Sequence, residues 1–185
     1  RRLLLLLLPF LTLLMVFMQI EGVLPLWVVR DVGLGSRFLG LLFTLNTLVV
    51  VLLEVALNLA MSHWTHGRQF LLGALCLAFG FGAVAWATGP LSLMLTTVVW
   101  TFGEMILFPA MSDAVAGLAP AARRGEYMGL VSVCFSGGLA LGPWLGVLTY
   151  AHLGPRWVWA GCFAVALVAG LVLAPFRATA AGEGG

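Results

Sequence analysis

Long runs of apolar residues fill this chain, and short polar segments separate them. A membrane-spanning helix needs about 20 mostly apolar residues, and six runs are close to that length. They are continuous, without the alternation of apolar and polar positions that barrel strands show. The pattern therefore predicts an all-α membrane protein with six spans, at residues 3–28, 38–62, 70–87, 91–118, 127–148 and 158–174.

The composition supports this prediction and excludes several classes of protein. Of the 185 residues, 62% are hydrophobic and 9% are charged, whereas soluble domains are about 25% charged. An ordinary soluble enzyme, a disordered segment and a free nucleic-acid-binding module are therefore excluded. The three cysteines are widely separated and show no metal-ligand spacing. We expect no metal, no cofactor and no nucleic-acid partner.

The arginines predict the orientation in the bilayer. Loops on the cytoplasmic side carry the excess of Arg and Lys, so we expect both termini in the cytoplasm and the protein in the cytoplasmic (inner) membrane. We expect residues 1–176 to form one six-helix unit and residues 177–185 to form a disordered cytoplasmic tail. The chain begins Arg-Arg without Met, which indicates a fragment. The side with the termini holds Arg1, Arg2, Arg68, Arg123, Arg124 and Arg177, against Arg30, Arg37 and Arg156 on the other.

Polar residues inside the spans predict which helices face inward. The third and sixth spans carry no ionisable residue, so we expect them to be outer, lipid-facing helices. The other four carry polar groups, which usually face a bundle interior or a cavity. Two inner helices and one outer, repeated once, form a three-plus-three repeat of the kind found in transporters.

Glu104 is the most informative of these polar residues, because it lies near the middle of its span. Thr97 and Thr101 share its helical face. Two interpretations stay open: a structural carboxyl that a neighbouring helix satisfies, or a cavity group that takes up and releases a proton.

The second span carries Glu54 and Asn58 on one face, with Asn46 angularly close to it. We expect these three, together with Gln19 in the first span, to line a cavity. Asp113 lies near the cytoplasmic end of the fourth span, where we expect it to pair with an interfacial arginine.

The fifth span carries the most specific motif: Gly129, Gly138, Gly142-Pro143 and Gly146. Small residues at such spacing let a second helix approach closely. The spacing resembles the antiporter motif of the major facilitator superfamily, G-x8-G-x3-G-P-x2-G-G, with Val147 in place of the last glycine. The preceding segment, residues 124–129, resembles the drug:proton antiporter branch of that superfamily.

The loop after the second span resembles a decayed copy of the cytoplasmic signature of the same superfamily. Gly67 and Arg68 keep its late Gly-Arg pair, whereas Trp64 stands in the Asp position. The fourth span also lacks the intramembrane arginine expected of the first half. Both departures resemble the second, C-terminal half of the family fold.

The resemblance implies a secondary active transporter, namely proton-coupled efflux of small amphipathic molecules across the lipid bilayer. It implies a missing N-terminal six-helix half as partner. Glu104 is the first choice for the proton-coupling carboxyl and Glu54 the second, with Gln19, Asn46 and Asn58 as neutral hydrogen-bonding groups. The glycines of the fifth span would be a packing seam; Gly67, Arg68, Asp113 and Arg124 would act as cytoplasmic anchors or gate partners.

Two rival functions remain to be weighed. A rhomboid-like serine protease needs a Gly-x-Ser-Gly setting and an intramembrane His. Here Cys134-Phe135 precede Ser136-Gly137 and no His lies inside a span, so we do not expect an enzyme. A half-size protein that works as a homodimer, or a non-transporting scaffold, stays open.

Overall fold

A computed structural model describes residues 2–176, and this part of the chain is entirely helical. Six of its helical stretches are long and apolar enough to cross a membrane, which confirms the predicted fold class. The predicted tail, residues 177–185, lies outside the described residues. The elements are α1 (Arg2–Phe17), η1 (Met18–Ile20), α2 (Val23–Leu26), η2 (Trp27–Asp31), α3 (Ser36–Met61), α4 (His66–Ala83), η3 (Val84–Trp86), α5 (Pro90–Leu118), η4 (Ala121–Arg123), α6 (Arg124–Leu153) and α7 (Pro155–Leu173).

The first predicted span is not one regular helix. It passes from α1 through the 3-10 turn η1, breaks at Gly22, and continues through α2 into a π-helical turn, η2. Pro25 contributes to the break, because it has no backbone N–H to donate to the carbonyl four residues earlier. The regular α-helical geometry of this span is therefore interrupted from Met18 to Gly22.

Proline and glycine set the sharpest boundaries of the other helices. Pro90 begins α5, and Gly89 is capped through Ser92, whose hydroxyl accepts from the Gly89 N–H at 3.2 Å. Gly154, with φ of +93°, ends α6, and Pro155 begins α7 directly afterwards. This is the usual placing of glycine after a helix and proline at its start.

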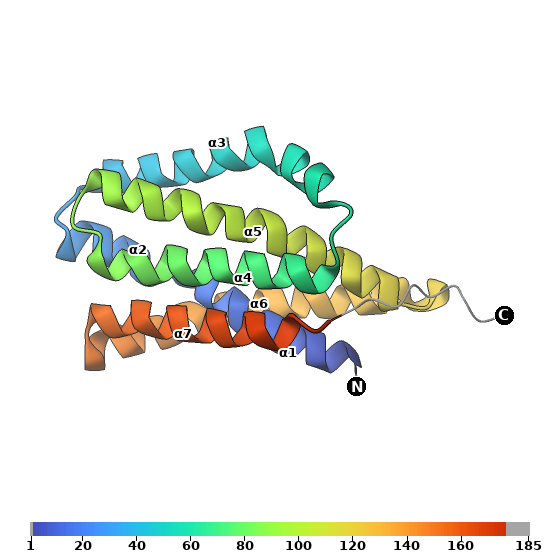
Figure 1. Cartoon of the computed structure of the whole chain (residues 1–185). Coiled ribbons are helices and arrows are strands. Elements are labelled where there is room, and N and C mark those ends of the chain that lie inside the picture. Colours follow the sequence, from blue (N-terminus) through green and yellow to red (C-terminus); the bar gives the residue numbers. More distant parts are fainter. Residues whose placement is uncertain (1, 177–185) are drawn as a thin grey trace.

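The helices form a bundle in which α4 is central and α3 is peripheral. In Figure 1, α3 runs along one side of α5, and α4 lies between α5 and α7. The helix α1 packs against α6 and α7. Most of the apolar stretch of α4 is buried and almost none of α3 is. The third span thus differs from the outer helix we expected, because α5 and α7 cover it on two sides.

Small residues explain why α4 is so well covered. At Gly80, a Cβ atom would lie 2.6 Å from the backbone nitrogen of Trp100 in α5. At Gly170 of α7, it would lie 2.6 Å from the Cβ of Ala74 in α4. Small residues at a helix contact let the two backbones approach closely in a membrane protein. Glycines and alanines, rather than polar groups, therefore bring α4 to the centre.

Candidate functional site

A polar cluster joins α3 to α5 in the middle of both helices. Asn46 of α3 donates from Nδ2 to Glu104 Oε1 at 2.6 Å and to Thr101 Oγ1 at 3.0 Å. Thr101 is fully buried, and its hydroxyl donates to the Thr97 carbonyl at 2.7 Å. Thr101 therefore uses its hydroxyl both as a donor and as an acceptor. The structure therefore brings Asn46, one of the amides predicted to line a cavity, to the face of α5 that carries Glu104 and Thr101.

A second polar contact joins the same two helices 12 residues further along α3. Asn58 Nδ2 donates to the Glu54 carbonyl at 2.8 Å and to the Met105 carbonyl of α5 at 3.3 Å. Twelve residues of helix correspond to about 18 Å. The Glu54 carboxyl is half-buried, and within residues 2–176 it accepts no hydrogen bond. Two amide contacts therefore fasten α3 to α5, and two carboxyl groups lie along that contact.

The chemistry of the cluster suits a group that changes its protonation state. The Asn46 amide can donate to Glu104 Oε1 in either state of the carboxyl, because a proton can reside on Oε2. Glu104 is only half-buried, and the opposite face of α3 is open, with Val51, Leu52 and Val55 more than 70% exposed. The Glu104 carboxyl is thus held by its hydrogen bond from Asn46, while the face of α3 that points away from α5 stays exposed.

Gln19 does not join this cluster, contrary to the expectation that it shares a cavity with Glu104. Its side chain is 4% exposed, and Nε2 donates to the Met15 carbonyl at 3.0 Å and to the Gly142 carbonyl of α6 at 2.7 Å. A Cβ atom at Gly146 would overlap the Gln19 amide. The depth of Gln19 was predictable, but α1 is rotated so that this side chain packs on α6.

Three glycines of the motif in α6 lie in the contact with the first span. A Cβ at Gly138 would lie 2.7 Å from Leu14 Cβ, and one at Gly142 would lie 2.7 Å from the Met15 carbonyl oxygen. Pro143 packs against Gly22, where a Cβ would lie 2.9 Å from its Cα. Gly129 is exposed, with nothing within 4 Å of a Cβ placed there. The motif thus divides into a packed part and an open first position.

The cytoplasmic residues predicted as anchors do not form one group. His66 Nε2 lies 2.9 Å from Asp113 Oδ2, so Asp113 pairs with a histidine of α4 and not with an arginine, as we expected. Gly67 packs against the carbonyl oxygens of Ala174 and Phe176. Arg68 and Arg124 are exposed, and neither forms a salt bridge within residues 2–176.

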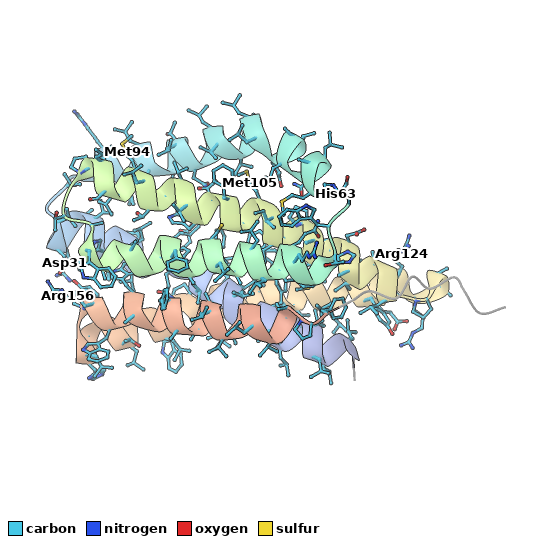
Figure 2. The ribbon with its side chains drawn as sticks, in the orientation of Figure 1. Asp31, His63, Met94, Met105, Arg124 and Arg156 are labelled. Atoms are coloured by element: carbon cyan, nitrogen blue, oxygen red, sulfur yellow. The ribbon has the colours of Figure 1, made fainter. Side chains whose placement is uncertain are left out.

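Residues 121–126 hold another ion pair close to this surface. Arg123 Nη2 donates to Glu126 Oε2 at 2.6 Å, and both side chains are more than 60% exposed. Figure 2 places His63 and Arg124 toward the same end of the bundle. Across residues 2–176, no three His, Cys, Asp or Glu side chains are grouped so that they could hold a metal ion.

Comparison with known proteins adds a family to this geometry. The model of the Major Facilitator Superfamily matches residues 5–183. The chain is 26% identical over 129 residues to the uncharacterized MFS-type transporter YttB of Bacillus subtilis, covering 69% of this chain and 32% of that protein. It is 23% identical over 165 residues to a Na(+), Li(+), K(+)/H(+) antiporter of Planococcus maritimus. That match covers 80% of this chain and 39% of the antiporter. The match to each relative thus spans well under half of that relative.

Proposed function

Because this chain belongs to the major facilitator superfamily, we propose that it is the C-terminal six-helix half of a secondary transporter, and not an enzyme. The partner in the membrane would be an N-terminal six-helix half. The exposure of α3 supports this arrangement, because its uncovered face carries no partner within residues 2–176. The antiporter-type spacing of glycines on α6 supports the choice of half.

The contact between Asn46 and Glu104 carries the proposal that transport is coupled to protons. In this mechanism Glu104 takes up a proton from one side of the membrane and releases it to the other, as the two halves rock around a central site. The Asn46 amide holds the carboxyl in place in both states. Asn58 and Glu54 line the same contact and serve the substrate, which we propose to be a small amphipathic molecule leaving the cell.

The orientation follows from the distribution of arginine. We propose that the end of the bundle where α6 begins faces the cytoplasm, in the inner membrane, because the segments that the order of spans in the sequence assigns to that side carry six of the nine arginines. Arg68, Arg124 and the pair of His66 and Asp113 lie at this end and would act in the cytoplasmic gate. The motif residues Gly138, Gly142 and Gly146 support the bundle rather than bind substrate.

Transport by the full-length protein in proteoliposomes tests the role of Glu104. With an imposed pH gradient, we expect Glu104→Gln to abolish proton-driven transport, because the amide keeps the size of the side chain but cannot exchange a proton. Glu21→Gln is the matched control, since Glu21 is exposed directly before the break in the first span, and it should transport as the wild type does. Wild-type coupling in Glu104→Gln at normal protein yield would refute the assignment.

A further inference from the structure

A polar cavity opens at the end of the bundle opposite the termini. It has a volume of about 470 Å³, and its lining includes Asp31 and Arg156, which Figure 2 shows near one another. Tyr150 donates to Asp31 Oδ2 at 2.7 Å, which leaves the other carboxylate oxygen without a partner in the described chain. Arg156 forms no salt bridge within residues 2–176. One anionic and one cationic group therefore face the same space without neutralising each other.

The indole of Trp27 supplies a third unsatisfied group in this wall. Its side chain is 8% exposed, and its Nε1 atom is buried without an acceptor among residues 2–176. The ring lines the cavity and meets Trp159 edge-on, with centroids 6.2 Å apart. Buried N–H groups without an acceptor are rare. The helix α7 also begins here with Pro155, and the positive end of its dipole favours a negatively charged group.

An apolar groove leads away from the polar cavity along the surface of α4 and α7. Arg156 and Trp157 line both the cavity and the start of this groove, where Trp86 and Ala160 complete the wall. Trp86 and Ala160 also line the next section, of about 370 Å³. The remaining residues of that section are all apolar: Phe79, Gly82, Ala83 and Phe163.

The position of the groove matches the edge of a bilayer. Trp86 and Trp157 are 78% and 64% exposed, and tryptophan is enriched at the level of the lipid head groups. Further along the groove, Phe79 of α4 is 56% exposed. The polar cavity is therefore at head-group depth, and the groove descends from it into the hydrocarbon region.

We propose that this cavity and groove bind one phospholipid with a primary ammonium head group. The phosphate contacts Arg156 and the N-terminus of α7, the ammonium contacts Asp31, and one acyl chain lies in the groove between α4 and α7. The adjacent charges of opposite sign on Asp31 and Arg156 suit a zwitterionic head group. The head group of an anionic lipid would instead be repelled by the Asp31 carboxylate.

Native mass spectrometry of the full-length protein in mild detergent tests the site by titration with phosphatidylethanolamine. Arg156→Gln removes the cation proposed to contact the phosphate and should weaken binding about fivefold, which corresponds to about 1 kcal/mol. Arg37→Gln is the matched control, because Arg37 begins α3 at the same end of the bundle but does not line the cavity. Equal binding by wild type and Arg156→Gln, or an equal loss in Arg37→Gln, would overturn the site.

Two further variants test the head group and the acyl chain separately. Phosphatidylcholine with the same chains lacks N–H donors, so the wild type should prefer phosphatidylethanolamine severalfold and Asp31→Asn should lose this preference. Ala160→Phe fills the groove at the point that its two sections share, and should weaken binding of both lipids. An unchanged preference in Asp31→Asn would overturn the head-group assignment, and unchanged binding in Ala160→Phe would overturn the placement of the acyl chain.

Discussion

Replacing Gly142 with alanine should loosen the contact between α1 and α6. The added Cβ would lie 2.7 Å from the Met15 carbonyl oxygen and 3.1 Å from the Met15 Cα. Both are backbone atoms, so no rotamer change relieves the clash. Ordinary contact begins near 3.4 Å, and the difference from 2.7 Å requires the helices to separate by about 0.7 Å. Overpacking of this kind costs about 1–3 kcal/mol.

Separation also strains the hydrogen bond from Gln19 Nε2 to the Gly142 carbonyl, now 2.7 Å long. Such bonds between membrane helices contribute about 0.6 kcal/mol on average. Alanine is about 1 kcal/mol better than glycine inside a helix, which offsets part of the loss. The net loss is therefore about 0.6–2.6 kcal/mol. For a chain of this size, each kcal/mol lowers the melting temperature by about 2–4 °C.

Gly129→Ala is the matched control within the same motif. Nothing lies within 4 Å of a Cβ at Gly129, so only the helix preference for alanine remains and stability should stay equal or rise slightly. Thermal unfolding of both variants of the full-length protein in detergent measures the contrast. This prediction would be refuted if Gly142→Ala had the melting temperature of the wild type, or if both variants lost stability equally. Either result would show that the close approach of the helices at the packed glycines does not stabilise α6.

Two other substitutions test the polar contacts. Asn46→Val removes the hydrogen bonds to Glu104 and Thr101 and should lower the free energy of unfolding by about 1 kcal/mol, measured by the same melting assay; an unchanged melting temperature would show that the amide does not hold α3 to α5. Asp113→Asn removes the carboxylate that contacts His66 Nε2, and because the Asp113 side chain is 80% exposed, stability should change by less than about 1 kcal/mol. A transport rate that falls in Asp113→Asn without a change in melting would identify the pair as part of the gate, and an unchanged rate would argue against that role.

The sequence predicted the number of spans well, because hydropathy and length alone identify membrane helices. It also predicted that Thr97, Thr101 and Glu104 share one face of a helix. It could not predict that Asn46 is the partner of Glu104, since helix periodicity says nothing about which helix lies opposite. That contact depends on the packing of α3 against α5, which the apolar surface of α3 does not specify.

The misplacement of Gln19 has a related cause. Its depth suggested a cavity, and Gln19 does line one of about 250 Å³ together with residues of α6 and α7. Glu104 does not line that cavity, because helix rotation decides which neighbour a side chain meets. The bare backbone at Gly142 and Gly146 leaves room for the amide on α6, and that space could have been inferred from the glycine motif. The pair of His66 and Asp113 was also within reach of the sequence, because His66 begins one helix and Asp113 lies near the end of the next at the same side of the membrane.

The dependence of α3 on a single neighbour has a consequence for the time course of synthesis. Asn46 and Glu104 are 58 positions apart, and at about 5–20 residues per second a ribosome needs roughly 3–12 s to make the intervening chain. During that interval α3 is already made while α5, its main helical neighbour among residues 2–176, is not. The Asn46 amide then lacks both of its partners on α5. The helix α3 therefore settles on α5 only after α4 and half of α5 have been made, later than its place in the sequence suggests.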